Sequence, residues 1–129
     1  MRVKRQEAID VRVKDLNYLI ELFNPQFVYK DECFFLESHF DEENYKKHWK
    51  RKILEDRQKV EATINHVHLG DLVEDIEEQE KLGKKLKEIW QEKLSQLFPH
   101  RRFKLMLSKV LLDSDYEWVL DLWMKRDKK

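Results

Sequence analysis

The stretch V-E-A-T-I-N-H-V-H-L-G-D-L at residues 60–72 decides the fold predicted for this chain. Over residues 60–69 the even-numbered positions form one set, Val60, Ala62, Ile64, His66 and His68, and the odd-numbered positions form the other. A period of two over ten residues predicts a β-strand, in which alternate side chains point to opposite faces. Because both sets become apolar or semi-polar toward the end, we expect a central strand covered on both faces, which Gly70 then breaks.

Two aromatic-rich runs on the N-terminal side of this stretch predict a β-hairpin. They are F-V-Y-K at residues 27–30 and C-F-F-L-E-S-H-F at residues 33–40, separated by Asp31 and Glu32. Both runs are β-prone, and a short polar break between such runs is typical of a hairpin. The turn type stays open, because Asp-Glu is not a preferred turn pair.

A helix is predicted before this hairpin. Apolar residues recur at spacings of three and four up to Phe23, and Pro25 ends the pattern. We expect the helix over residues 15–23. Residues 8–14 fit either its extension or a short strand, since their apolar residues also alternate with polar ones.

Two further helices and a second hairpin are predicted in the rest of the chain. Asp41 is a candidate N-cap for a helix with an apolar seam at Tyr45, Trp49 and Ile53. Asp71 followed by Glu74 has capping-box spacing, so the longest helix is expected from there, or from about residue 77, to residue 97. Alternating runs at residues 103–111 and 116–124 predict an antiparallel hairpin.

These elements predict a single α+β domain over residues 1–129, in the order α-β-β-α-β-α-β-β. We expect one mostly antiparallel sheet of about five strands with two to three packed helices. The basic tail at residues 125–129 is expected to fray.

Composition excludes some classes of function. The chain has 26 basic and 26 acidic residues, so no net charge draws it to nucleic acid or to an anionic membrane. No apolar run approaches a membrane span, so no membrane association is expected. Cys33 is the single cysteine, which fits a reducing compartment and predicts a cytoplasmic protein.

A polar patch is predicted around the central strand, formed by Asn65, His66, His68 and Asp71. Residues two apart on a strand point to one face, so the two imidazoles could share a metal or exchange a proton. A zinc site needs three or four ligands, with Asp71, His39 and Glu61 as the remaining candidates. We favour partly buried, hydrogen-bonded histidines with no cofactor, and an Asp71 that caps the following helix.

Other candidate sites have simpler explanations. The basic arc of Lys46, Lys47, Lys50 and Arg51 could contact phosphates but is better explained as a solvated helix face. Arg101 and Arg102 form a positive spot too small for a groove. Cys33 lacks a nearby cation and is interpreted as a small buried hydrophobe rather than a nucleophile.

Trp118 and Trp123 fall on opposite faces of the last predicted strand, so one of them is exposed if helices cover only one face. An exposed aromatic residue on a sheet often marks an interface. We therefore expect a non-enzymatic binding or regulatory module that docks a protein partner or itself as a homodimer. Small bacterial immunity and antitoxin-like proteins share this build by analogy only. The alternatives are an enzyme that uses His66 and His68 and, third, a nucleic-acid binder that uses the arc from Lys46 to Arg51.

Overall fold

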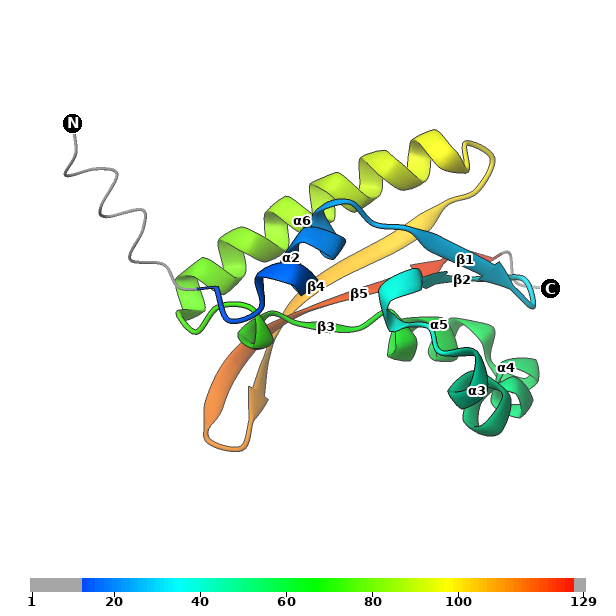
Figure 1. Ribbon diagram of the computed structural model, residues 1–129, viewed down its shortest axis with the longest axis horizontal. Coiled ribbons are helices and arrows are strands. Elements are labelled where there is room, and N and C mark those ends of the chain that lie inside the picture. Colours follow the sequence, from blue (N-terminus) through cyan, green and yellow to red (C-terminus); the bar gives the residue numbers. More distant parts are fainter. Residues whose placement is uncertain (1–12, 127–129) are drawn as a thin grey trace.

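Two antiparallel sheets, one of two strands and one of three, form the framework on which the helices pack (Figure 1). The structure is a computed structural model that describes residues 13–126. Strands β1 (Phe27–Lys30) and β2 (Cys33–Leu36) form the smaller sheet. The larger sheet has the order β3-β5-β4, with β3 at Val67–His68, β4 at Phe103–Leu112 and β5 at Asp115–Met124. The predicted α+β class is confirmed, but the prediction of one sheet of about five strands is wrong.

The β4–β5 hairpin is the longest feature of the larger sheet, and its tip projects beyond the body of the molecule (Figure 1). Its register pairs Phe103 with Met124 and Leu112 with Asp115. Asp113 adopts a positive φ of 56° in the turn, which Asp tolerates better than most residues. The two alternating runs therefore form the hairpin that the sequence predicted.

Helix α6 (Ile76–Leu97) lies along one face of the larger sheet (Figure 1). Its buried residues include Leu86, Trp90 and Leu94, as the predicted apolar arc requires. The helix is capped by Asp75, whose side chain accepts a hydrogen bond from the Glu78 amide. The prediction that Asp71 caps this helix is therefore wrong.

Helix α2 (Leu16–Phe23) packs on α6 and begins where the sequence predicted. Asp15 caps it by accepting a hydrogen bond from the Tyr18 amide. Before the helix, Val13 forms an isolated antiparallel bridge with Val73. Most of residues 8–14, for which helix and strand were both open, lies outside the described residues, as do residues 127–129 of the expected frayed tail.

Strand β2 is buried along its whole length, because it is shared by two hydrophobic cores. Phe34 and Leu36 join the main core beneath α6, whereas Cys33 and Phe35 join a second core with Tyr45 and other residues of the following helices. The β1–β2 turn places both Asp31 and Glu32 at positive φ, 52° and 64°. Two positive φ values are typical of a type I′ turn, so the turn left open by the sequence has this character.

The chain between the two sheets is helical. It comprises α3 (Glu42–Asn44), a π-helical turn (Tyr45–Trp49), α4 (Lys50–Glu55) and α5 (Arg57–Ile64). Asp41 caps the first of these as predicted, and Asp56 interrupts the series and caps α5.

The prediction of a strand over residues 60–69 is therefore wrong, since only Val67 and His68 are extended in β3. The alternation had a second explanation, because Val60, Glu61 and Asn65 also fall together on one helical face, and all three are buried. The helix forms because Asp56 caps its N-terminus and the buried residues have helical spacing, and these two effects outweigh the alternation.

Candidate functional site

Asn65 ends helix α5 and joins three parts of the fold. Its fully buried side chain accepts a hydrogen bond from the Leu36 amide and donates to the carbonyl oxygens of Phe34 and Leu122. Its hydrogen-bonding groups are thus engaged by β2 and β5. This geometry gives Asn65 a structural role and leaves it no group directed at a ligand.

His66 and His68 lie side by side although only His68 belongs to the short strand β3 and His66 directly precedes it. Their ring centroids are 4.4 Å apart, in an edge-on arrangement. Each imidazole is paired through Nδ1 with a carboxylate of β5, His66 with Asp121 at 2.5 Å and His68 with Glu117 at 3.0 Å. The second Glu117 oxygen accepts a hydrogen bond from the Gly70 amide. Two histidine–carboxylate pairs therefore stand next to each other.

Such pairs have a definite chemical capacity. A carboxylate that accepts from Nδ1–H fixes the imidazole tautomer and makes Nε2 a better base or metal ligand. Two imidazoles still provide only two ligands. Among residues 13–126, no group of three or more His, Cys, Asp or Glu side chains is arranged to hold a metal ion.

The structure separates the other candidate ligands from this pair. Glu117, rather than Asp71, orients His68, and Asp71 is exposed in the loop that follows β3. Glu61 is fully buried and accepts hydrogen bonds from the amides of Phe34 and Met124 and from Arg126. The sequence did not identify Glu117 or Asp121, although both lie on one face of the predicted last strand.

His39 is engaged with Tyr18. Its Nδ1 donates to the Ile64 carbonyl oxygen at 2.7 Å, and its Nε2 is left to accept from the Tyr18 hydroxyl. Burial, reinforced by the nearby His66, lowers the pKa of His39, whereas burial raises that of Tyr18. Both groups are therefore neutral near pH 7 and stabilise the packing of α2 on the centre of the chain.

Cys33 is fully buried, in keeping with the interpretation as a small hydrophobe. The prediction that it lacks a nearby cation is wrong, because the Arg126 guanidinium donates to its Sγ at 3.4 Å. Burial, together with the negative charge of Glu61, raises the pKa of its thiol to about 12. Because the thiolate is the nucleophile, this environment suppresses reactivity.

The predicted interface tryptophans are both half-buried. Trp118 packs against the main core beneath α6, and its amide donates to Gln79. Trp123 lies on the opposite face of β5, beside Lys104 of β4. The basic arc from Lys46 to Arg51 keeps its four cations exposed, as expected for a solvated helix face.

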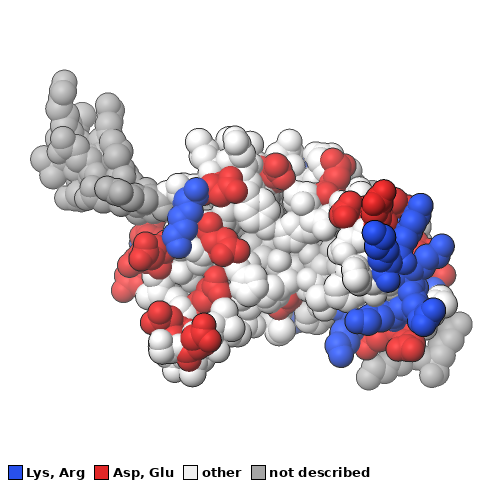
Figure 2. Space-filling model, turned by 60° about the horizontal axis from the view of Figure 1, so that its bottom comes forward, with Lys and Arg blue, Asp and Glu red and all other residues white. Residues whose placement is uncertain are grey.

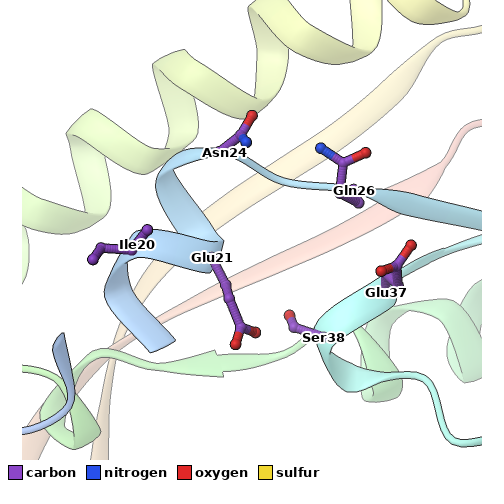
Figure 3. A pocket seen from close by; sticks show the side chains of 6 residues that line it. All are labelled: Ile20, Glu21, Asn24, Gln26, Glu37 and Ser38. Carbon is purple, nitrogen blue, oxygen red and sulfur yellow. The ribbon is translucent and has the colours of Figure 1, made fainter. Parts of the chain in front are cut away.

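One cavity, of about 400 Å³, lies between α2, the start of β1 and the turn after β2 (Figure 3). It is lined by Ile20, Glu21, Asn24, Gln26, Glu37 and Ser38. Figure 3 shows the Glu21 carboxylate extending toward Ser38, while Asn24 and Gln26 lie at the opposite end of the cavity. The lining combines the apolar Ile20 with five polar residues, two of them acidic, and this cavity was not identified from the sequence.

A second, larger cavity is basic. It has a volume of about 920 Å³ and is lined by Glu32, Arg57, His100, Arg101, Arg102, Met124, Lys125 and Arg126. The prediction that the Arg101–Arg102 spot is too small for a groove is therefore wrong. The signal that was missed is the register of the last hairpin. Because Phe103 pairs with Met124, the Arg101–Arg102 pair before β4 lies beside the Lys125–Arg126 pair after β5.

Charge is unevenly distributed over the molecule although the totals balance. On the face of the molecule shown in Figure 2, most Lys and Arg side chains lie at the end that holds α4, α5 and the end of β5. The opposite end is mainly acidic, and an uncharged area lies between them. No described helix has the length and apolar character needed to cross a membrane.

These features define the class: an α+β protein with a helix-covered antiparallel hairpin, a histidine–carboxylate cluster and a basic cavity. A family model, the uncharacterized protein PM0498 family, matches residues 3–125. The chain belongs to this family. No curated protein and no solved structure matches it.

Proposed function

We propose that this protein is a non-enzymatic, self-associating binding module that dimerises through the outer edge of β4. The observation that carries the proposal is the position of β4 in the sheet order β3-β5-β4. Its ten residues, about 33 Å of strand, have no strand partner on the outer side among the described residues. A long unpaired edge is a template for another strand.

The side chains at the projecting end of the hairpin support an interface there. Leu111 and Tyr116 are paired across the hairpin and are 56% and 58% exposed. Leu112 and Met106, which point to the other face, are also exposed. Apolar side chains on both faces of a projecting hairpin favour a protein partner over solvent.

A second copy of the chain suits this edge better than an unrelated strand. Two β4 strands related by a two-fold axis at Ser108 would pair antiparallel over nearly their whole length. The exposed Met106 would then face Val110, and Leu111 would face Leu105 of the other copy. The two β4 lysines face the apolar Leu112 and Leu107, so no like charges are opposed.

Light scattering of the purified protein tests the assembly, and a cysteine substitution tests the register. We expect a dimer, and we expect Ser108→Cys to give a disulfide-linked dimer on mild oxidation because two copies of residue 108 face each other. Ser95→Cys on the exposed face of α6 is the matched control and should stay monomeric on a denaturing gel.

A charge substitution tests whether dimerisation depends on the β4 edge or is disturbed by a new charge at any exposed position. Met106→Glu combined with Leu111→Glu should give a folded monomer, whereas Leu54→Glu, at a residue 74% exposed on α4, should leave the dimer intact. A wild-type protein that is monomeric at all accessible concentrations would exclude the proposal. Dimers that persist in the double variant would exclude this interface.

A second candidate function rests on the paired imidazoles. His66 and His68, each oriented by a β5 carboxylate, have the tautomer control that a metal-assisted or acid–base enzyme needs. Elemental analysis of the purified protein is the test. Stoichiometric zinc that is lost in His66→Ala would favour this alternative, and a metal-free protein would oppose its metal-assisted form.

A further inference from the structure

The basic cavity brings together three parts of the chain that lie far apart in sequence. Arg57 comes from the start of α5, Arg101 and Arg102 precede β4, and Lys125 and Arg126 follow β5. The Lys125 amide donates to the Arg102 carbonyl oxygen at 2.8 Å, which continues the hairpin pairing by one step. The backbone thus fixes the two basic pairs beside each other.

Three of the arginines are held in place before any ligand arrives. Arg126 donates to Glu61, to the Met124 carbonyl oxygen and to the Glu32 carbonyl oxygen. Arg101 donates to the Met124 sulfur and lies over the Tyr29 ring at 6.0 Å, and Arg57 donates to the Asp31 carbonyl oxygen at 3.1 Å. A ligand that binds here would not have to order these side chains, which removes part of the entropic cost of binding.

The cavity has an excess of positive charge. Five cationic side chains line it against one carboxylate, Glu32. Glu61 compensates Arg126 from beneath, so about three positive charges remain without a carboxylate among the described residues. Arg102 and Lys125 form no ion pair with any carboxylate of residues 13–126.

We propose that this cavity binds a small ligand carrying two or more phosphate-type negative charges. Guanidinium groups match the geometry of phosphate oxygens and bind them through paired hydrogen bonds, a role open to Arg57, Arg101 and Arg102. The Nη hydrogens of Arg126 are engaged by Glu61, Met124, Glu32 and Cys33, so Arg126 contributes charge rather than paired hydrogen bonds. A volume of about 920 Å³ lies at the upper end of the range for small-molecule sites, so there is room for a ligand the size of a nucleoside diphosphate. This site uses none of the apolar residues of the hairpin tip, and ligand binding is measured separately from dimerisation.

Isothermal titration calorimetry in a phosphate-free buffer of low ionic strength tests the site, with inorganic pyrophosphate, a nucleoside diphosphate and a short single-stranded oligonucleotide as probes. The test variant is Arg102→Gln with Lys125→Gln. Both side chains lack carboxylate partners in the described structure, so their loss should not weaken the fold. Lys85→Gln with Lys87→Gln, on the exposed face of α6, removes the same charge elsewhere.

We expect pyrophosphate or the nucleoside diphosphate to bind the wild type and the α6 control alike. The test variant should bind about tenfold or more weakly, because two charge-assisted contacts are lost. Absence of binding by both small probes would overturn the proposal, as would equal weakening in the two double variants. Binding of the oligonucleotide alone would also overturn it and would point to a nucleic-acid surface. Dimerisation is measured separately, so failure here leaves the proposed function untouched.

Discussion

Glu61 and Arg126 form an ion pair of 2.8 Å that joins helix α5 to the end of the last strand. Glu61 is fully buried and also accepts hydrogen bonds from the amides of Phe34 and Met124. One carboxylate therefore ties together both sheets and the helix between them. Its charge is balanced by a guanidinium that remains partly open to solvent.

Glu61→Gln should destabilise the protein by about 2–4 kcal/mol. The substitution leaves Arg126 without its counter-charge and places an amide NH₂ against a backbone N–H, and loss of one partner of a buried pair costs about 3–5 kcal/mol. The expected loss of stability is set below the cost for a fully buried pair because Arg126 is partly exposed to solvent. Urea unfolding measures the change, with Glu88→Gln on the exposed face of α6 as the control. Equal stabilities of the two variants would contradict the structural role of the pair.

Gly83→Val should destabilise the fold by about 1–3 kcal/mol through overpacking. A Cβ at position 83 would lie 2.5 Å from a Leu107 methyl group and 2.7 Å from a Leu69 methyl group. The glycine thus lets α6 approach the sheet, because the Leu107 and Leu69 side chains occupy the space that a Cβ would need. Thermal unfolding checks this, and Lys84→Val, one position along on the exposed face, isolates the cost of a β-branched residue in the helix.

The local elements were predictable where one signal dominated. Asp41 caps a helix as predicted, and the alternation after residue 103 specifies the last hairpin. Residues 60–65 were misassigned because the alternation of Val60, Ala62 and Ile64 coexists with a helical face formed by Val60, Glu61 and Asn65. The choice between them depends on Asp56 and on buried partners distant in sequence.

The candidate site was only partly predictable for a similar reason. His66 and His68 lie together in the structure, but Glu117 and Asp121, which hold them, come from a strand about fifty residues away. The separation of the two sheets is also a tertiary property. It follows from β2 being buried on both faces between two cores, which the sequence of β2 alone does not specify.

The Cys33 thiol should be unreactive in the folded protein. Burial raises its pKa to about 12, so almost no thiolate exists near pH 8, and the side chain has no exposed surface. We expect labelling by iodoacetamide only after denaturation, detected by mass spectrometry. Ser95→Cys supplies an exposed thiol of the same chain as the control, and labelling of both thiols at similar rates in the native protein would show that the second core opens readily.

His39 should make the fold less stable at mildly acidic pH. Burial lowers its pKa in the folded state, so on acidification below about pH 6.5 the unfolded state binds the proton first. Stability therefore falls with pH from about 6.5 down to the folded pKa, below which the loss levels off. His66 strengthens the shift, whereas Glu21 and the Ile64 carbonyl oxygen oppose it.

The test of this pH dependence is His39→Gln, which removes the titrating ring but keeps a side chain able to donate to Ile64. Urea unfolding at a series of pH values should show a smaller decrease in stability between pH 7 and pH 5.5 than the wild type. His48→Gln, which replaces an exposed histidine of the π-helical turn, should keep the wild-type dependence. If His39→Gln and the wild type lose stability in parallel, the protonated ring is tolerated in place, and Tyr18 must then rotate its hydroxyl hydrogen away to accept the new N–H.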